Sequence, residues 1–158
     1  MQLHDILIPK RVTSGMPATS KKRVLEQISA LLREGESELD QNAAFQSLVE
    51  RERLGSTGIG NGVALPHGRV KGLKRAVGAF ATLAHDMDYE AADGKPVNMV
   101  FALLVPENAN EEHLQVLSII AAVFSDQNFR NRLLKAGNAR EIYRLITHQN
   151  DVASRRAS

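Results

Sequence analysis

Apolar residues recur at helical spacing in the first third of the chain and predict two helices there. The first helix is capped by Ser20 and stopped by Gly35. Its apolar face consists of Val24, Leu25, Ile28, Leu31 and Leu32. The second helix is predicted to begin near Asp40 and to end at Gly55, with Phe45, Leu48 and Val49 buried. The segment before Ser20 has no pattern that assigns its structure.

Short apolar runs farther along the chain predict strands. Val63–Leu65 is a short apolar strand that Pro66 interrupts, and residues 75–83 are rich in residues with β propensity. Val97–Val105 is nearly all apolar, too short for a typical helix, and closed by Pro106. We therefore predict a third strand there that is covered on both faces.

Three helices are predicted after this strand, each marked by a polar residue at its N-cap. The caps are Asn110, Asp126 and Asn138, the last in a capping box with Glu141. The apolar positions are Leu114, Leu117, Ala121 and Phe124 in the first helix, Phe129 and Leu133 in the second, and Ile142, Leu145 and Ile146 in the third. Gly137 stops the second of these helices.

Helices at both ends of the chain around a few strands indicate an α/β fold. We expect a single domain with one mixed β-sheet and helices on both faces. The length of 158 residues fits one compact domain, which we place at residues 1–150. Residues 151–158 are polar, and we expect them to form a disordered tail.

Composition excludes several classes of protein. The chain has no cysteine, which excludes disulfides, thiolate metal sites and cysteine nucleophiles. Its longest apolar stretches fall far short of the ~20 residues that span a bilayer, and its N-terminus is not a signal peptide. We therefore expect a cytoplasmic protein with no membrane insertion. A net charge of +2 and an aromatic content of 4% argue against nucleic acid as a partner.

A glycine-rich segment, residues 55–62, separates the second helix from the first strand. It matches neither common nucleotide-binding template, because Val63 replaces the third glycine of a dinucleotide fingerprint and no Walker lysine occurs. Beyond it, His67 lies between Pro66 and Gly68, where proline breaks strand pairing and the ring can project from the sheet. Neutral imidazole is a nucleophile near neutral pH, and backbone N–H groups can hold phosphoryl oxygens.

Residues 54–68 read Leu-Gly-Ser-Thr-Gly-Ile-Gly-Asn-Gly-Val-Ala-Leu-Pro-His-Gly. They resemble the phosphorylation-site signature of the enzyme IIA domains of the mannitol/fructose class in the bacterial phosphotransferase system. Residues 20–29 and 101–117 also resemble the nitrogen-regulatory subgroup of that class. The resemblance covers nearly the whole chain up to about Ile146, and so long and irregular a signature is poorly explained by chance.

The resemblance implies which residues form the site. The phosphoacceptor is His67, the second active-site histidine is His113, and the active-site arginine is Arg51. Arg53 stays open as an alternative to Arg51, because both flank Glu52 in a charge run typical of a solvated surface. The backbone or rim of the phosphate pocket is assigned to Ser56, Thr57, Gly58, Gly60, Gly62 and Gly68.

The surroundings of these residues carry further expectations. His113 lies in the first turn of its helix, where an anion is favoured, and Glu111 and Glu112 of that turn are expected to face solvent. An apolar rim that excludes water is expected from Leu54, Ile59 and Val63. No metal and no organic cofactor is implied. A zinc site on the two histidines would need a third ligand, such as Asp86 or Asp88, that nothing in the sequence singles out.

The resemblance implies a phosphohistidine carrier, a phosphotransferase component of mainly regulatory role. An HPr-like phosphocarrier protein would pass its phosphoryl group to Nε2 of His67, with Nδ1 held by a backbone carbonyl. Regulated targets such as transporters or sensor kinases would read the phosphorylation state. Because the chain ends at Ser158, we expect no fused IIB or IIC domain. A sugar-specific fructose or mannitol IIA that relays phosphate to a IIB domain, and a binding module that never carries phosphate, stay open as alternatives.

Overall fold

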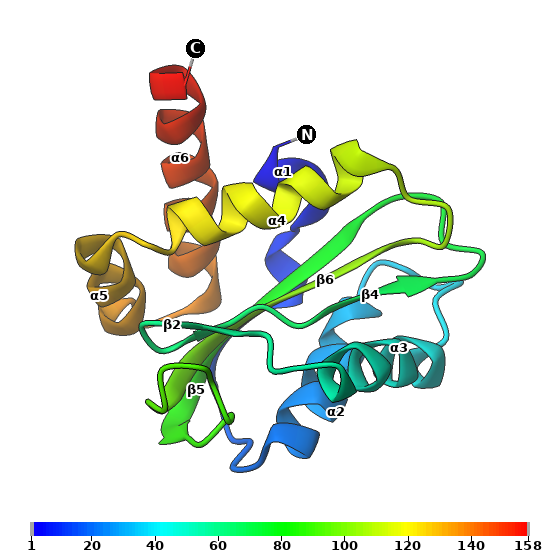
Figure 1. Ribbon diagram of the computed structural model, residues 1–158. Helices are drawn as coiled ribbons and strands as arrows, with labels where there is room; N and C mark the ends of the chain where they lie inside the picture. Colours follow the sequence, from blue (N-terminus) through cyan, green and yellow to red (C-terminus); the bar gives the residue numbers. More distant parts are fainter. Residues whose placement is uncertain (1, 158) are drawn as a thin grey trace.

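The computed structural model describes residues 2–157, apart from the side chains of Glu112 and residues 150–157. In this part of the chain a mixed β-sheet lies between two layers of helices (Figure 1). The strands are β1 (Val12–Met16), β2 (Gly58–Gly60), β3 (Val63–Ala64), β4 (His67–Val70), β5 (Val77–Met87) and β6 (Val97–Pro106). The helices are α1 (Leu3–Ile6), α2 (Lys21–Leu32), α3 (Gln41–Arg53), α4 (Glu111–Val123), α5 (Gln127–Lys135) and α6 (Ala139–Ala157), with a 3-10 turn η1 (Pro9–Arg11).

Strand β6 is the centre of the sheet. It pairs antiparallel with β5 along one edge and parallel with β3 and then β4 along the other. The strand order is β1-β5-β6-β3-β2, with β4 beside β6 beyond the end of β3. Leu65 and Pro66 separate β3 from β4, and the Pro66 carbonyl accepts a hydrogen bond from the Leu103 N–H (3.0 Å). The predicted break in pairing therefore falls just before His67, and pairing resumes at His67 itself, opposite Leu103.

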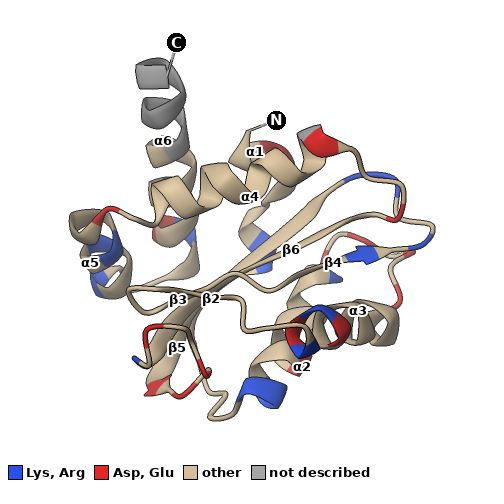
Figure 2. Cartoon of the chain, in the orientation of Figure 1, with Lys and Arg blue, Asp and Glu red and all other residues tan. Residues whose placement is uncertain are grey.

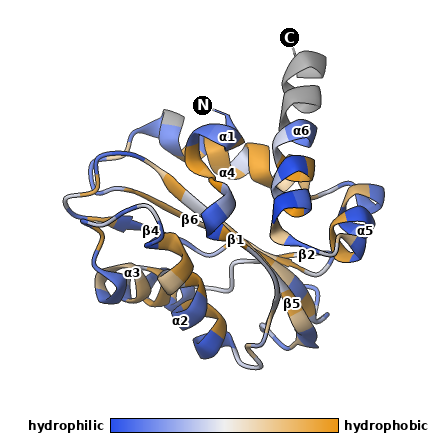
Figure 3. Ribbon diagram, turned by 180° about the vertical axis from the view of Figure 1, so that it is seen from behind, coloured by the Kyte–Doolittle hydropathy of each residue, from blue (hydrophilic) through white to orange (hydrophobic). Residues whose placement is uncertain are grey.

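Side chains of β6 alternate between the two helical layers, so the prediction of a strand covered on both faces is confirmed. Val100, Ala102 and Leu104 pack with α2 and α3. The opposite face packs with α1, α4, α5 and α6, and its β6 residues are Met99, Phe101, Leu103 and Val105. Seen from behind, apolar residues concentrate on the strands and on the helix faces that meet them (Figure 3). This double burial explains why the strand is apolar at every position except Asn98.

The predicted helices and their caps are confirmed. Ser20 accepts a hydrogen bond from the Arg23 N–H (3.2 Å) at the start of α2, and Asp40 caps α3. Asn110, Asp126 and Asn138 accept backbone N–H groups in the same way at α4, α5 and α6. The backbone of α6 continues to Ala157. The side chains of residues 150–157 and the whole of Ser158 lie outside the described residues. The disorder expected for residues 151–158 therefore stays a prediction.

The opening segment is where the structure adds most to the sequence pattern. It contains α1, η1 and the edge strand β1, which pairs parallel with β5. Arg11 is buried in it and donates hydrogen bonds to the carbonyls of Gly78 (2.9 Å), Glu34 (2.8 Å) and Ile6 (2.9 Å). Its Nη1 also lies 3.9 Å from a Glu36 carboxylate oxygen. Because a buried arginine resembles a surface residue in the sequence, hydrophobic periodicity did not find this segment.

The predicted apolar stripe of α4 is wrong in part. The buried residues of this helix and its C-cap are Val116, Ile120, Val123 and Phe124. Leu114 is exposed, and Leu117 and Ala121 are half-buried. The second half of α4 is apolar on every side, so hydrophobic periodicity could not decide which face meets the sheet.

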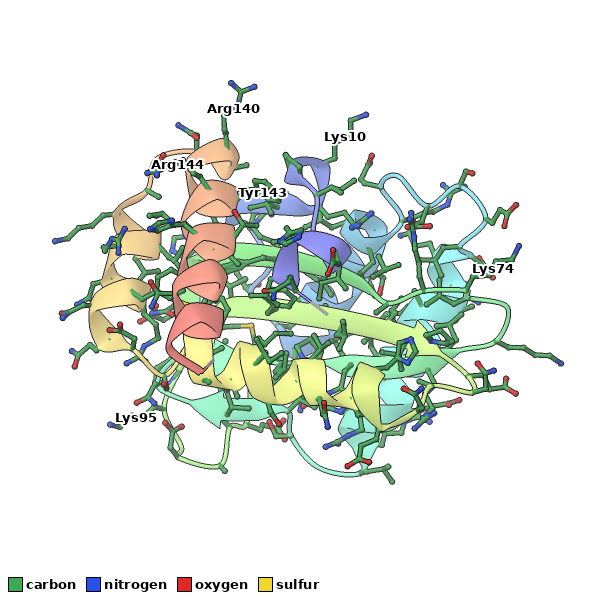
Figure 4. All side chains as sticks on the ribbon, turned by 90° about the horizontal axis from the view of Figure 1, so that it is seen from above. Lys10, Lys74, Lys95, Arg140, Tyr143 and Arg144 are labelled. Atoms are coloured by element: carbon green, nitrogen blue, oxygen red, sulfur yellow. The ribbon has the colours of Figure 1, made fainter. Side chains whose placement is uncertain are left out.

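Charged side chains lie mainly at the periphery. Figure 2 shows charged residues mostly on the helices and loops, with a few on β4 and β5, while β6 carries none. Side chains of this kind that project outward are labelled in Figure 4: Lys10, Lys74, Lys95, Arg140 and Arg144. Arg11 and Glu52 are the charged residues among those described that are buried instead.

Gly68 allows α3 to pack closely against β4. A Cβ atom at Gly68 would lie 2.0 Å from the Ser47 hydroxyl oxygen and 3.0 Å from the Ser47 backbone carbonyl. The Ser47 hydroxyl spans this contact and donates to the Arg69 carbonyl (2.8 Å). The glycine is therefore required by the separation of the two backbones rather than by an unusual φ angle.

We expect Gly68→Ala to lower the free energy of unfolding by about 1–3 kcal/mol, because α3 must move away from β4. Gly137→Ala is the matched control, since no atom lies within 4 Å of the added carbon. Its effect should stay within about 0.5 kcal/mol. Urea denaturation of both variants measures the difference, and equal stability of Gly68→Ala and the unchanged protein would contradict the close approach.

Candidate active site

His67 lies in the wall between two neighbouring cavities of about 350 and 290 Å³. Arg51 and Leu117 line both of them together with His67. The first cavity is completed by Ser47, Glu50, Leu54, Gly68, Arg69, Leu103, Val105 and Leu114. The second is completed by Ser56, Thr57, Ile59, Leu65, Ser118 and Ala121. The histidine is therefore accessible between α3 and α4, which flank β4 in Figure 1.

One face of each flanking helix is turned toward His67. The lining residues of α3 and its C-cap are Ser47, Glu50, Arg51 and Leu54, and those of α4 are Leu114, Leu117, Ser118 and Ala121. Both sets follow the i, i+3, i+4, i+7 spacing of a single helix face. The predicted core stripe of α4 thus contained residues that border the site, and helical spacing from Arg51 would have found the α3 set.

The ring of His67 is held in one orientation by its own strand. Nδ1 lies 2.9 Å from the Leu65 carbonyl oxygen. Because a carbonyl oxygen only accepts, Nδ1 carries the proton and Nε2 of the neutral ring keeps its lone pair. Burial lowers the pKa of the imidazole, and the positive charge of Arg51 lowers it further, against the raising effects of the Leu65 carbonyl and Glu52. The net shift is downward, so the ring is neutral at neutral pH.

Arg51, and not Arg53, is the arginine that lies beside His67. Arg51 Nη1 donates to the Gly55 carbonyl (3.0 Å), and the side chain lines both cavities. Arg53 lines a separate groove between α2 and α3. Within the described residues Arg51 forms no ion pair with a carboxylate, so its charge faces the cavities without a counter-ion from the protein.

His113 lies in the first turn of α4, as predicted. The Asn110 carboxamide oxygen accepts both its backbone N–H (3.3 Å) and its ring Nδ1 (3.0 Å). The ring is half-buried, and Glu111 beside it is exposed. The linings of the two cavities, taken over the described residues, do not include His113, although Leu114 and Leu117 of the same helix belong to them. His113 thus stands at the border of the site.

Arg69 is a site residue that the sequence analysis missed. Its Nη1 donates to the carbonyls of Glu107 (3.0 Å) and Ala109 (3.1 Å) in the segment that leads into α4. It therefore ties β4 to the N-terminal end of α4, where His113 lies. Its position two residues after His67 was the available signal, because alternate residues of a strand share a face.

The glycine-rich segment forms a hairpin. Asn61 and Gly62 have φ angles of 58° and 82°, as a two-residue turn between paired strands requires. Gly58 packs against Ala91, where a Cβ atom would lie 2.6 Å from the alanine Cβ. Ser56 and Thr57 line the second cavity, whereas the linings of both cavities over the described residues leave out Gly58, Gly60 and Gly62. The phosphate-pocket role assigned to these glycines stays a prediction.

Glu52 is buried, so the interpretation of its charge run as fully solvated is wrong at this position. Its carboxylate accepts hydrogen bonds from the Thr57 N–H (2.9 Å), the Thr57 hydroxyl (2.5 Å) and the Tyr89 hydroxyl (3.3 Å). Lys21 Nζ lies 2.8 Å from it and 4.9 Å from the centre of the Tyr89 ring. The sequence offers no local signal for this network, because two of its members lie about 30 or more residues from Glu52.

Exposed apolar side chains surround the opening to His67. Leu54 is 84% exposed, Ile59 44% and Leu114 36%, and each lines one of the two cavities. Leu54 and Ile59 therefore lie where the predicted rim required them. Val63 does not, because it points into the core beneath α4 and is 1% exposed. The third exposed apolar side chain of the rim is Leu114 instead of Val63.

In the described part of the chain, no group of three histidine and acidic side chains is arranged to hold a metal ion. Asp88, considered above as a ligand, accepts a hydrogen bond from the Glu90 N–H (2.9 Å). None of its helices is both long enough and apolar enough to cross a bilayer.

Residues 5–149 match the family described as "Phosphoenolpyruvate-dependent sugar phosphotransferase system, EIIA 2". The chain belongs to this family of phosphotransferase components. It is 44% identical over 146 residues to the nitrogen regulatory protein of Pseudomonas aeruginosa, covering 92% of this chain and 95% of that protein. It is 40% identical over 148 residues to the nitrogen regulatory protein of Escherichia coli, covering 93% and 90%.

Solved structures agree with this membership. The crystal structure of nitrogen regulatory protein IIA-Ntr from Neisseria meningitidis superposes with a TM-score of 0.84 at 45% identity, over 90% of this chain and 97% of that one. IIA mannitol from Escherichia coli superposes with a TM-score of 0.73 at 21% identity, over 89% and 98%, and shares the fold. The expected single mixed sheet with helices on both faces is therefore confirmed.

We expect Arg51→Met to raise the pKa of His67, because it removes a positive charge that disfavours the imidazolium while keeping a long side chain. NMR titration of the ring resonances measures this. Arg53→Met is the control and should leave the pKa unchanged, since Arg53 lies in a different groove. An equal shift in both variants would show that the charge of Arg51 is not specifically directed at His67.

Proposed function

We propose that the chain is a phosphohistidine carrier of a regulatory phosphotransferase system. His67 accepts a phosphoryl group from an HPr-like phosphocarrier protein, and the phosphorylation state is read by target proteins. The observation that carries this proposal is the hydrogen bond from Nδ1 of His67 to the Leu65 carbonyl, which leaves the Nε2 lone pair free in an accessible site with an uncompensated arginine beside it.

The proposed transfer is a single displacement at phosphorus. The Nε2 lone pair forms the new nitrogen–phosphorus bond as the bond between phosphorus and the carrier breaks, and the electron pair of the broken bond returns to the carrier. Nδ1 keeps its proton throughout, so the Leu65 carbonyl stabilises the positive charge that develops on the ring. Holding the reacting ring in place before the encounter lowers the entropic part of the barrier.

In this proposal Arg51 supplies stabilising charge. His113 supplies a hydrogen bond from Nε2 in its imidazolium form, because Nδ1 already donates to Asn110. The Arg51 guanidinium faces the cavities and neutralises the equatorial oxygens of the transferring group. His113 stands at the N-terminus of α4, and its ring is oriented by Asn110. The exposed Leu54, Ile59 and Leu114 offer the carrier an apolar surface around the histidine, which excludes water from the phosphorylated ring.

A regulatory role is favoured over a sugar relay by the relatives. Nitrogen regulatory proteins match the chain at 36–44% identity over at least 92% of its length. A phosphoryl group adds a charge of about −1.5 to −2 at pH 7, which reverses the local potential at the apolar rim and so changes which surfaces can dock there. The second candidate is a sugar relay, supported by the PTS system fructose-specific EIIA component of Haloferax volcanii at 33% identity over 120 residues.

Incubation with phosphoenolpyruvate, enzyme I and the phosphocarrier should add the mass of one phosphoryl group, as read by intact mass spectrometry at neutral pH. His67→Ala should abolish this addition because it removes the acceptor nitrogen. His148→Ala, at an exposed position of α6, is the matched control and should be phosphorylated like the unchanged protein. Full labelling of His67→Ala would contradict the site, and no labelling of the unchanged protein would contradict the function.

His113→Ala should still accept a phosphoryl group, but transfer from the carrier and back to it should each be roughly 100-fold slower, because both directions share a transition state that loses a stabilising hydrogen bond. Rapid-quench measurement of transfer in both directions tests this. Wild-type rates in both directions would remove His113 from the site.

A phosphorylated sample incubated with fructose- or mannitol-type IIB domains separates the two candidate functions. A regulatory protein should retain its phosphoryl group, whereas a sugar relay should lose it to one of these domains. Rapid transfer to a IIB domain would favour the relay.

A further inference from the structure

Among the residues whose side chains the structure describes, Glu52 is the one acidic residue next to the site that is buried. It is 9% exposed, between the solvent-accessible side chains of Arg51 and Arg53. Burying a carboxylate is costly unless it is paired and hydrogen-bonded. Here the pairing is extensive, since Lys21, Thr57 and Tyr89 all contact the carboxylate. Burial raises the pKa of the Glu52 carboxyl, but the hydrogen bonds from Lys21 and Thr57 outweigh burial and hold the pKa below its ordinary value.

A chain of hydrogen bonds leads from this carboxylate to the ring of His67. The Glu52 carboxylate accepts hydrogen bonds from the N–H and the hydroxyl of Thr57. The Thr57 carbonyl in turn accepts a hydrogen bond from the Leu65 N–H (2.9 Å). The Leu65 carbonyl in turn accepts Nδ1 of His67 (2.9 Å). The bond between Thr57 and Leu65 closes the base of the β2–β3 hairpin, so the peptide that orients the ring is held on both sides.

Each link in this chain acts on the backbone directly before His67. Leu65 and Pro66 are not paired as strand residues between β3 and β4, so the sheet ladder alone does not fix the direction of the Leu65 carbonyl. The bond from the Leu65 N–H to Thr57 supplies that constraint. Thr57 is itself fixed by Glu52 through two bonds, one to the backbone and one to the side chain.

We infer that Glu52 is a positioning residue for His67: through Thr57 and Leu65 it sets the orientation of the imidazole and selects the ring nitrogen that is free to react. Lys21 balances its charge, which keeps the carboxylate ionised without leaving an unpaired charge beside the nucleophile. The catalytic meaning of this role rests on the proposed function, whereas the orientation of the ring does not.

Glu52→Gln tests the inference with little change in shape. Lys21 loses its counter-charge and the amide must accept and donate where the carboxylate only accepted, so the hold on Thr57 weakens. In ¹⁵N NMR spectra of the imidazole we expect the population protonated at Nδ1 to fall, and the pKa of His67 to fall because a negative charge that raises it is removed. Phosphoryl acceptance should slow roughly 10-fold.

Thr57→Val and Thr57→Ser provide a second test in case Glu52→Gln fails to fold. Valine keeps the volume of threonine but lacks the hydroxyl that binds Glu52, so the ring population should shift as in Glu52→Gln. Serine keeps the hydroxyl and should restore the population protonated at Nδ1. Failure of serine to restore it, with valine shifted, would mean that the side-chain bond to Glu52 is not the link.

Two controls separate positioning from simple stabilisation. Tyr89→Phe removes one bond to the carboxylate but leaves the N–H and hydroxyl of Thr57 on Glu52, so it should lower the melting temperature without changing the tautomer of His67. Glu26→Gln removes a peripheral carboxylate that also pairs with a lysine, Lys22, and should change neither. If Glu52→Gln and Thr57→Val melt like Tyr89→Phe and keep the unchanged tautomer, pKa and transfer rate, the inference is wrong.

The NMR measurements need no phosphocarrier, so the two proposals can fail separately. If the unchanged protein accepts no phosphoryl group, the proposed function fails while the tautomer still decides the role of Glu52. If phosphorylation occurs but Glu52→Gln leaves the ring and the rate unaltered, only the role of Glu52 fails.

Discussion

The structure depends on one strand that is buried on both faces. Because β6 is buried and apolar from Met99 to Pro106, it is covered by a helical layer on each side. Strands β3, β4 and β5 take their register directly from it. The edge that β6 offers to β3 and β4 is continuous, but the chain that pairs with it is interrupted at Leu65 and Pro66. Directly after this interruption, the side chain of His67 lies between α3 and α4.

The chemistry of the site follows from how charge is distributed around this interruption. Burial and the charge of Arg51 lower the pKa of His67, and a backbone carbonyl orients its ring, so a nitrogen lone pair and a cation face the same cavities. The neighbouring carboxylate, Glu52, is paired instead with Lys21 in a network that includes Tyr89. Arg51 and Glu52 are neighbours on α3, but the positive charge of Arg51 faces the cavities and the negative charge of Glu52 is buried beside Lys21. The cavities therefore keep a positive charge that can attract an anion.

The sequence predicted the helices well where caps and one-sided apolar faces coincide, as in α2 and α5. It placed the start of α4 but not its buried face, because the second half of that helix is apolar on every side. At the site, a long signature pointed to His67, Arg51 and His113, and the structure brings the first two together and leaves the third at the border. Arg69 and Ser47 were missed although strand alternation from His67 and helical spacing from Arg51 place them on the site faces. Their hydrogen bonds to distant backbone carbonyls could not be read from the sequence.

The sequence by itself determined the class of fold and the central strand, which follow from local periodicity, and it singled out His67 as the candidate histidine through the resemblance of a contiguous motif. Only the tertiary structure decided which of two arginines reaches that histidine, which face of α4 borders it, and that Glu52 is buried. Each of these depends on contacts between segments distant in sequence, such as Glu52 with Lys21 and Tyr89. Two arginines such as Arg51 and Arg53 cannot be told apart in the sequence, and their different surroundings arise only when the helices pack against the sheet.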